Sequence, residues 1–297
     1  MYRLVIVCLF FWVSACGVPL ARKGEQNPLV YDVTEVDQAE KIAIFIPGVL
    51  ASIDIFNVTD DWEDAGYARV FHRFPGLDGL KNDHFIDPQT MAVRVAAFAN
   101  EYPDKDIALV GYSTGGPVAL LAAPMITKGR SVRVAAMSTA VEHGGGAQTA
   151  FRGLTDIVRA MAATGSVRRK VVWKRFWAGL LYGPDALGDP AFEERLTRDI
   201  AEGDKIIVRL DPDVALAHAL GLPTFTVPND FDLSDVPVAF FVGLNDRVFS
   251  TRQTVNFSKK IGGATIYGYR EQGHLLFFTR PDVFQDMLKF VEDRRLR

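Results

Sequence analysis

Residues 107–117 read Ile-Ala-Leu-Val-Gly-Tyr-Ser-Thr-Gly-Gly-Pro. The apolar run Ile107–Val110 predicts a buried strand, and the small residues from Pro117 to Ala123 predict a helix. The turn between them, Gly111–Gly115, has the pattern G-x-S-x-G. A strand, a sharp turn and a helix in this order force the central serine into a strained backbone conformation that exposes its hydroxyl above the sheet edge. Ser113 is therefore a candidate nucleophile; the alternative is a chance turn, because the bare pattern is common.

In this context the sequence resembles the α/β-hydrolase family, whose triad follows the chain order serine, acid, histidine. His274 follows the strand-like run Ala264–Tyr269, and Asp246 follows the apolar run Val236–Leu244 in a turn similar to the family's G-x-x-D-x-V turn. The resemblance implies an α/β fold with a mostly parallel, doubly wound sheet and a helical cap insertion. It also implies a triad of Ser113, Asp246 and His274 at the carboxyl ends of three strands.

The resemblance also locates a candidate oxyanion hole. The apolar run Ile42–Ile46 is typical of a strand buried on both faces, and it ends at Pro47-Gly48. The family usually has His-Gly here, and the next residue donates its backbone N–H to the oxyanion. On this basis Val49 and Thr114 are the expected donors, and the amides of the helix behind the serine add positive dipole. The proline is a departure from the family pattern.

Other patterns complete the expected core. We predict strands at Ala68–Phe74 and Val132–Thr139, and helices at Pro88–Asn100 and Pro281–Arg297. His72 and His84 come too early in the chain for the family's histidine, so we interpret both as surface or loop residues.

Glu142 is an alternative acid. It follows the predicted strand Val132–Thr139, and some lipases of the family take their acid from the end of this strand. Asp246 is the preferred assignment, with Glu142 as the alternative that mutation would test.

Residues 141–235 interrupt the alternation of strands and helices, and the resemblance makes them the cap. Helical patterns cover 154–163, 168–181 and 192–201. The segment Arg168–Leu181 carries aromatic and apolar residues on one face and basic residues on the other. One interpretation is a cap helix that packs its apolar face over the pocket. The alternative is an interfacial helix that contacts anionic lipid.

The N-terminus has the pattern of a signal peptide. Arg3 precedes the apolar run Leu4–Val13, which leads into Ser14-Ala15-Cys16. About ten apolar residues are too few for a membrane span, which needs about 20. Cysteine after small residues resembles the lipobox of bacterial lipoproteins, which implies cleavage before Cys16 and lipidation of its thiol. The alternatives are an ordinary secretory signal and a short N-terminal anchor.

These patterns predict a domain organisation and a location. We expect a signal peptide at 1–15, a lipidated tether at 16–38, an α/β core at 39–140 and 236–297, and a helical cap at 141–235. The protein would then be a membrane-anchored lipoprotein of the cell envelope. Gly17 after the cysteine fits the outer membrane or the periplasmic face if the source is Gram-negative.

Composition limits the remaining classes of function. With 297 residues, 48% of them hydrophobic, the chain can bury a large core. A net charge of −3 gives no reason to expect nucleic acid as a partner. We find no metal-ligand cluster and no phosphate-binding glycine loop, and therefore expect no cofactor and no metal.

The expected chemistry is hydrolysis of a carboxylic ester through an acyl-enzyme, as the resemblance implies. A cap rich in tryptophan, phenylalanine and leucine favours a small-molecule ester or lipid with an apolar acyl or alcohol part. A thioesterase, a peptidase, a carbon–carbon bond hydrolase or an acyltransferase would use the same triad, and the fold alone does not separate them. A membrane-anchored binding protein without catalysis is the alternative from a different class.

Overall fold

The computed structural model describes residues 27–83, 86–139, 143–144, 155, 158, 161–162, 165, 167–183, 186, 192, 194–199, 212–221, 224–228, 230–293 and 295. Within them, one seven-stranded sheet has the order β1-β3-β2-β4-β5-β8-β9. Its strands are β1 (Leu29–Val30), β2 (Lys41–Ile46), β3 (Tyr67–His72), β4 (Asp106–Tyr112), β5 (Val132–Met137), β8 (Val238–Gly243) and β9 (Thr265–Tyr269). The predicted α/β-hydrolase architecture is confirmed.

Parallel pairing joins every pair of neighbours in this sheet except β1 and β3, which are antiparallel. The register pairs Ile46 on β2 with Gly111 on β4, and Tyr112 on β4 with Met137 on β5. The carboxyl ends of these strands therefore lie at one edge of the sheet. In open parallel sheets this edge is where ligands bind.

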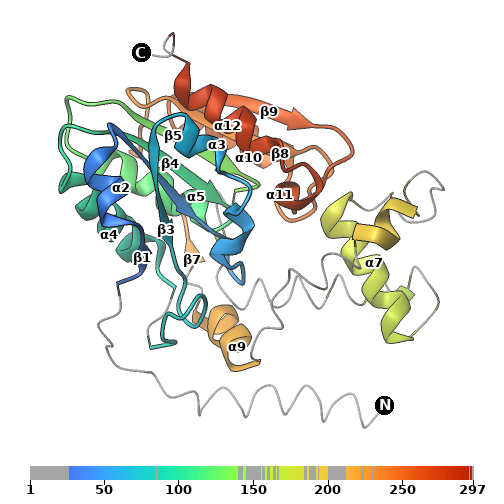
Figure 1. The fold of residues 1–297 in the computed structure, drawn as a ribbon. Helices are drawn as coiled ribbons and strands as arrows, with labels where there is room; N and C mark the ends of the chain where they lie inside the picture. The colour runs from blue at the N-terminus through green and yellow to red at the C-terminus, as the bar shows by residue number, and fades with distance from the viewer. Residues whose placement is uncertain are drawn as a thin grey trace.

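Helices cover both faces of the sheet (Figure 1). On one face pack α2 (Val33–Gln38), α4 (Pro88–Asn100), α5 (Gly115–Ala122) and α10 (Thr251–Lys260); on the other pack α3 (Asp61–Asp64), α11 (Leu276–Thr279) and α12 (Val283–Glu292). The side chains of β2 alternate between the two cores: Ile42, Ile44 and Ile46 enter the first, and Ala43 and Phe45 enter the second. This alternation explains why the run Ile42–Ile46 is apolar throughout.

The N-terminal edge of the core differs from the prediction. Strand β1 lies within the predicted tether, and α2 follows it directly. Asp32 caps α2 by accepting hydrogen bonds from the amides of Thr34 and Glu35. Leu29 and Val36 are buried in the core, so the segment from β1 to α2 belongs to the domain rather than to a tether.

One histidine assignment was wrong. His72 was expected at the surface, but it is the last residue of β3 and its side chain is fully buried, with its ring 5.7 Å from that of Phe74. His84, which was assigned in the same way, lies outside the described residues.

The described parts of the insertion between β5 and β8 contain helices and two short strands. It contains α7 (Arg169–Leu181) and α9 (Pro212–Gly221), and a short antiparallel pair forms between β6 (His143–Gly144) and β7 (Thr224–Phe225). Helical turns also occur within the predicted segments 154–163 and 192–201, which are described only in part. Helix α9 was not predicted.

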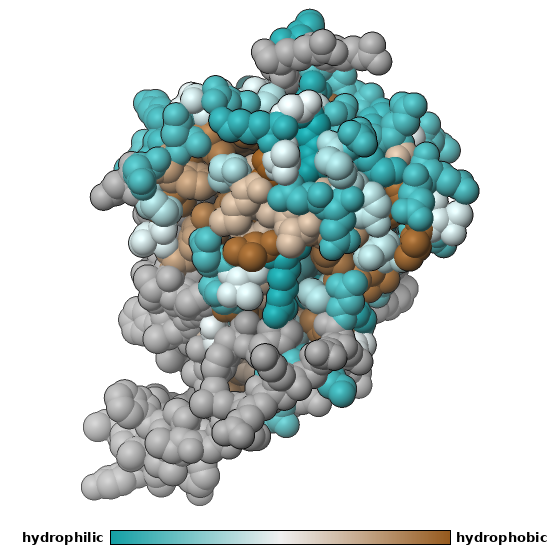
Figure 2. Space-filling view, turned by 90° about the vertical axis from the view of Figure 1, so that its left-hand side faces the viewer, coloured by the Kyte–Doolittle hydropathy of each residue, from teal (hydrophilic) through white to brown (hydrophobic). Residues whose placement is uncertain are grey.

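Two observations concern the outer surface. The face seen in Figure 2 is mostly hydrophilic, with smaller hydrophobic areas between the polar side chains. Among the residues that the structure describes, no helix combines the length and the apolar character needed to cross a bilayer.

Candidate active site

Ser113 lies in the turn between β4 and α5, where its backbone φ is +49°. Its N–H donates to the Met137 carbonyl at 2.9 Å, and its own carbonyl accepts from the Gly116 amide at 3.0 Å. The Thr139 hydroxyl lies 3.2 Å from the same Ser113 carbonyl oxygen. These bonds hold the serine in a left-handed conformation that non-glycine residues seldom adopt.

Glycines make this turn possible because the surrounding chains come too close for a side chain. A Cβ on Gly115 would lie 2.1 Å from the Ile46 carbonyl oxygen, and one on Gly111 would lie 2.5 Å from the Gly115 carbonyl oxygen. A Cβ on Gly48, in the loop after β2, would lie 2.8 Å from the Ser113 Cβ. The glycines of the motif therefore serve close packing around the serine.

The structure brings Ser113, Asp246 and His274 together. The Nε2 atom of His274 is 3.2 Å from the Ser113 Oγ, and its Nδ1 atom is 2.9 Å from Asp246 Oδ2. Asp246 and His274 are buried, whereas Ser113 is half-buried. One imidazole thus bridges a hydroxyl and a carboxylate, the arrangement in which a histidine can take a proton from the hydroxyl.

The turn after β8 orients the carboxylate. The second oxygen of Asp246, Oδ1, accepts hydrogen bonds from the amides of Val248 at 2.7 Å and Phe249 at 3.1 Å. With one oxygen held by the turn, the other points at His274. Donors on one oxygen and the imidazole on the other satisfy the hydrogen-bonding capacity of this buried carboxylate.

Aromatic rings enclose the imidazole. The ring of Tyr112 lies 5.5 Å from that of His274, and the ring of Phe249 lies 5.6 Å away. Burial, together with the negative charge of Asp246, raises the pKa of Tyr112 well above its ordinary value. Tyr112 therefore packs against the imidazole as a neutral phenol.

The backbone of the His274 loop is bound to the end of α7. The N–H groups of Gly273 and His274 donate to the carbonyls of Leu181 at 2.8 Å and Leu180 at 2.7 Å. The last carbonyls of a helix have no partner within the helix, so the loop satisfies groups that would otherwise be orphaned. Nothing in the sequence pattern indicates these contacts, because they are made by backbone atoms.

The apolar side of α7 packs within the protein. Trp177, Ala178 and Leu181 form a buried cluster with Leu196, and the partly buried Leu275 and Phe278 pack against it. Leu275 follows His274 directly, so the cap region contacts the loop that carries the imidazole. Trp177, Ala178 and Leu181 therefore face the protein interior, as expected for a cap helix that packs its apolar face inward.

The two expected oxyanion donors belong to segments that adjoin Ser113. Thr114 follows it and is buried at the start of α5. Val49 follows Gly48, whose backbone approaches the Ser113 Cβ. Two further predicted residues, Glu142 and Cys16, lie outside the described residues.

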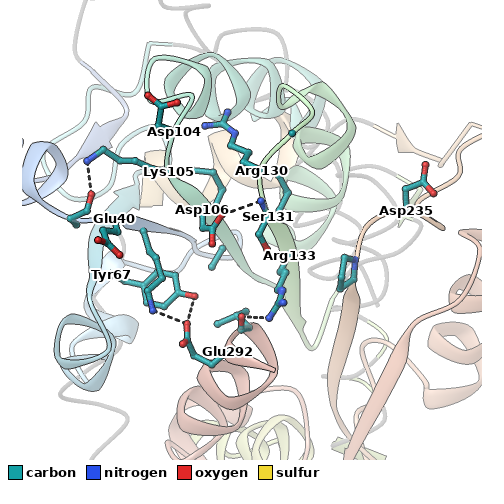
Figure 3. A pocket seen from close by; sticks show the side chains of 18 residues that line it. Glu40, Tyr67, Asp104, Lys105, Asp106, Arg130, Ser131, Arg133, Asp235 and Glu292 are labelled. Atoms are coloured by element: carbon teal, nitrogen blue, oxygen red, sulfur yellow. Dashed lines mark hydrogen bonds and ion pairs between the residues drawn. The ribbon is translucent and has the colours of Figure 1, made fainter. Parts of the chain in front are cut away.

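A polar cavity of about 1040 Å³ lies at the opposite edge of the sheet (Figure 3). Its lining includes Lys41, the first residue of β2, and Glu292, the last residue of α12. The Tyr67 hydroxyl donates to Glu292 Oε1 at 2.7 Å, and the Lys41 ammonium lies 3.1 Å from the same oxygen. Strand β4 has seven residues and so separates this cavity from Ser113 by about 20 Å. None of the predicted site residues lines it.

Among the described residues no cluster of three or more acidic, histidine or cysteine side chains could hold a metal ion.

Comparisons with known proteins agree with this architecture. The sequence matches the model of the alpha/beta hydrolase family over residues 43–286. The fold is similar to that of an enol-lactonase from Burkholderia xenovorans LB400, with a TM-score of 0.62 and 14% identity over 89% of this chain and 95% of that one. It is also similar to that of MenH from S. aureus, with a TM-score of 0.60 and 18% identity over 90% of this chain and 98% of that one. A thermophilic esterase from Thermogutta terrifontis has a TM-score of 0.60 and 15% identity, over 85% of this chain and 90% of that one. Identities at this level support a shared fold and no more. A search of curated proteins found no match.

Proposed function

Because the chain belongs to the α/β-hydrolase family, we propose that it is a serine hydrolase that cleaves a carboxylic ester through an acyl-enzyme intermediate. The observation that carries the proposal is the continuous chain of hydrogen-bond distances from Ser113 Oγ through His274 to Asp246. A serine next to a histidine that is oriented by a carboxylate is the arrangement needed for nucleophilic acyl transfer.

In the proposed mechanism His274 acts first as a base. Its Nε2 accepts the Ser113 proton while Oγ forms a bond to the ester carbonyl carbon, and the tetrahedral intermediate then expels the alcohol, which receives that proton. Asp246 keeps Nδ1 protonated and stabilises the imidazolium. A water molecule then attacks the acyl-enzyme with His274 as its base, which releases the acid and restores Ser113.

The oxyanion of the intermediate needs donors that are already in place. Thr114 and Val49 are the proposed backbone donors, because Thr114 follows Ser113 at the start of α5 and Val49 follows Gly48, whose backbone comes close to the Ser113 Cβ. Loss of one such donor typically costs about 3 kcal/mol of transition-state stabilisation.

An apolar ester is the proposed substrate class. Tyr112, Phe249 and the cluster of Trp177 and Leu181 surround the His274 loop. These side chains are buried, and a substrate bound beside them would gain about 25 cal/mol per Å² of apolar acyl or alcohol surface that it buries. The enol-lactonase and the esterase with similar folds act on esters according to their names, which agrees with this class.

Labelling with a fluorophosphonate tests the proposal. We expect the wild type to be labelled at Ser113, as peptide mass spectrometry would detect, and Ser113→Ala to be unlabelled. Ser234→Ala, which removes an exposed hydroxyl in the turn before β8, serves as a control that keeps the nucleophile. A folded wild type that resists labelling would favour a binding protein without catalysis.

A substrate panel then separates the chemistries that share this triad. We expect turnover of p-nitrophenyl esters with apolar acyl chains to exceed that of matched thioesters and peptide amides. Preference for a thioester or an amide, or transfer of the acyl group to an added alcohol, would reassign the reaction.

The cell-envelope location is a separate proposal, supported by the pattern that ends at Cys16. We expect cells that express the full chain to incorporate labelled palmitate into it, and Cys16→Ala to lose the label. Unchanged incorporation would contradict lipidation at this residue.

A further inference from the structure

His218 on α9 is buried, with 1% of its surface exposed, and it joins two loops of the core. Its Nδ1 atom accepts a hydrogen bond from the Leu50 amide at 3.3 Å, and its Nε2 atom lies 2.6 Å from the Pro75 carbonyl oxygen. Leu50 belongs to the loop after β2, and Pro75 to the loop after β3. A residue of the insertion thus holds two loops at the carboxyl edge of the sheet.

The two contacts define the state of the imidazole. An amide N–H can only donate and a carbonyl can only accept, so both bonds form when the ring is neutral and carries its proton on Nε2. Burial lowers the pKa of His218, while the Pro75 carbonyl opposes this shift. The described contacts of the ring are these two backbone groups and the Phe74 ring at 6.2 Å.

Leu50 occupies a strained position in a tight turn. The Ala51 amide donates to the Gly48 carbonyl at 3.1 Å, and the φ of Leu50 is +64°. A positive φ at the third residue alone is the form of a type II turn, which favours glycine there. Leucine is strained in this conformation, so the turn needs support from outside.

This turn contains the proposed oxyanion donor. Gly48, its first residue, approaches the Ser113 Cβ, and Val49 is its second residue. Turns of types I and II differ in the orientation of their central peptide group. Here that group joins Val49 to Leu50 and carries the Leu50 N–H. The hydrogen bond to His218 therefore acts on the group whose orientation distinguishes the two turns.

We propose that His218 is a positioning residue for the oxyanion hole: by accepting the Leu50 N–H, it holds the central peptide of the turn Gly48–Ala51 and so anchors the adjoining Gly48–Val49 peptide, whose N–H is the proposed donor. The inference rests on the proposed function, because it acts through Val49 in acyl transfer. It also couples α9 of the insertion to catalysis.

Replacement of the imidazole tests the inference. We expect His218→Leu to lower kcat for a p-nitrophenyl ester, and the rate of fluorophosphonate labelling of Ser113, by at least about tenfold, with KM changed less than about twofold. His218→Gln, whose amide can both accept and donate, should recover most of kcat. His72→Leu removes another fully buried histidine and controls for loss of packing, with kcat close to wild type.

A second variant separates positioning from stability. Glycine adopts a positive φ without strain, so Leu50→Gly combined with His218→Leu should restore kcat toward wild type. Thermal unfolding of each variant, measured beside kcat, separates this rescue from a general gain in stability. If leucine at 218 prevents folding, His218→Asn, too short to span both backbone groups, should fold and lower kcat at least threefold.

The outcomes distinguish this inference from the proposed function. Wild-type kcat and labelling rate in folded His218→Leu or His218→Asn would overturn the inference while leaving the hydrolase intact. Absence of rescue by Leu50→Gly would also overturn it. Failure of the wild type to label at Ser113 would overturn both the proposed function and this inference.

Discussion

Backbone strain concentrates at the catalytic edge of the sheet. Of the non-glycine residues with positive φ, Leu50, Ser113, Ser138 and Glu271 follow β2, β4, β5 and β9 respectively. Strained residues persist where their surroundings determine the conformation, and such places are often functional sites. At Ser113 and Leu50 the hydrogen bonds described above hold the backbone in the strained conformation.

The acid of the triad can be tested by paired substitutions. Asp246→Asn should lower kcat by about 10⁴, because an amide does not hold His274 in the required tautomer. Glu142→Gln should leave kcat close to wild type. Kinetics with a p-nitrophenyl ester measure both, and a large loss in the second variant alone would move the acid to residue 142.

The buried His218 should make stability depend on pH. Its pKa in the folded protein is lowered from the ordinary value of 6.5, so below about pH 6.5 the unfolded chain binds a proton that the folded state resists. Stability should therefore fall as pH decreases through this range and recover as pH rises.

His218→Gln has no titrating group at this position and serves as the reference. In urea unfolding between pH 7.5 and 5.5, the free energy of unfolding of the wild type should decrease relative to this variant. Parallel curves would show that His218 keeps an ordinary pKa in the folded state.

At the scale of elements, the end of α7 supports the loop that carries the imidazole. The Leu180 carbonyl accepts from both His274 and Leu275, at 2.7 and 3.2 Å, and the Asn245 side chain donates to the Tyr182 carbonyl at 3.1 Å. Asn245 and His274 belong to the turns of the acid and the base. The last turn of α7 thus connects the insertion to both.

Two glycines provide a matched test of this contact. A Cβ on Gly273 would lie 2.4 Å from the Leu180 carbonyl oxygen, so Gly273→Ala should separate the loop from α7 and lower both kcat and stability. Gly179 lies inside α7, where an added Cβ comes no nearer than 3.9 Å to Arg247. Gly179→Ala should leave kcat unchanged and stabilise by up to about 1 kcal/mol.

Thermal unfolding and ester kinetics on both variants measure these effects. Normal kcat in Gly273→Ala would mean that the histidine loop holds its position without α7.

At the scale of the whole molecule, the N-terminal segment completes the domain. Strand β1 pairs with β3 at the edge of the sheet, and Val36 of α2 is fully buried, whereas Val33 on the same helix is 58% exposed. The Lys105 ammonium also donates to the Val36 and Asp37 carbonyls, at 2.6 and 2.9 Å. The segment thus covers part of the apolar core.

The two valines of α2 test this role. Val36→Ala should lower the free energy of unfolding by about 2 kcal/mol, because it removes buried methyl groups and leaves a cavity. Val33→Ala should change it by less than about 0.5 kcal/mol. Urea denaturation compares the two, and equal effects would show that α2 is dispensable to the core.

Local patterns accounted for much of the fold. The helix Pro88–Asn100 has the predicted bounds, and the strands around 42–46 and 107–110 were placed to within two residues at each end. The reason is physical: side-chain periodicity and the turn chemistry of glycine and proline act between near neighbours. The order of Ser113, Asp246 and His274 could also be read from the chain.

Tertiary structure decided the contacts between distant segments. The burial of His72, the packing of α2, the bond between His218 and the Leu50 amide and the attachment of the His274 loop to α7 were not predicted. Each depends on which backbone groups meet after folding, and such groups are chemically identical along the chain. The sequence by itself thus determined the strands, the motif and the order of the site residues, whereas only the folded chain determined what holds them in place.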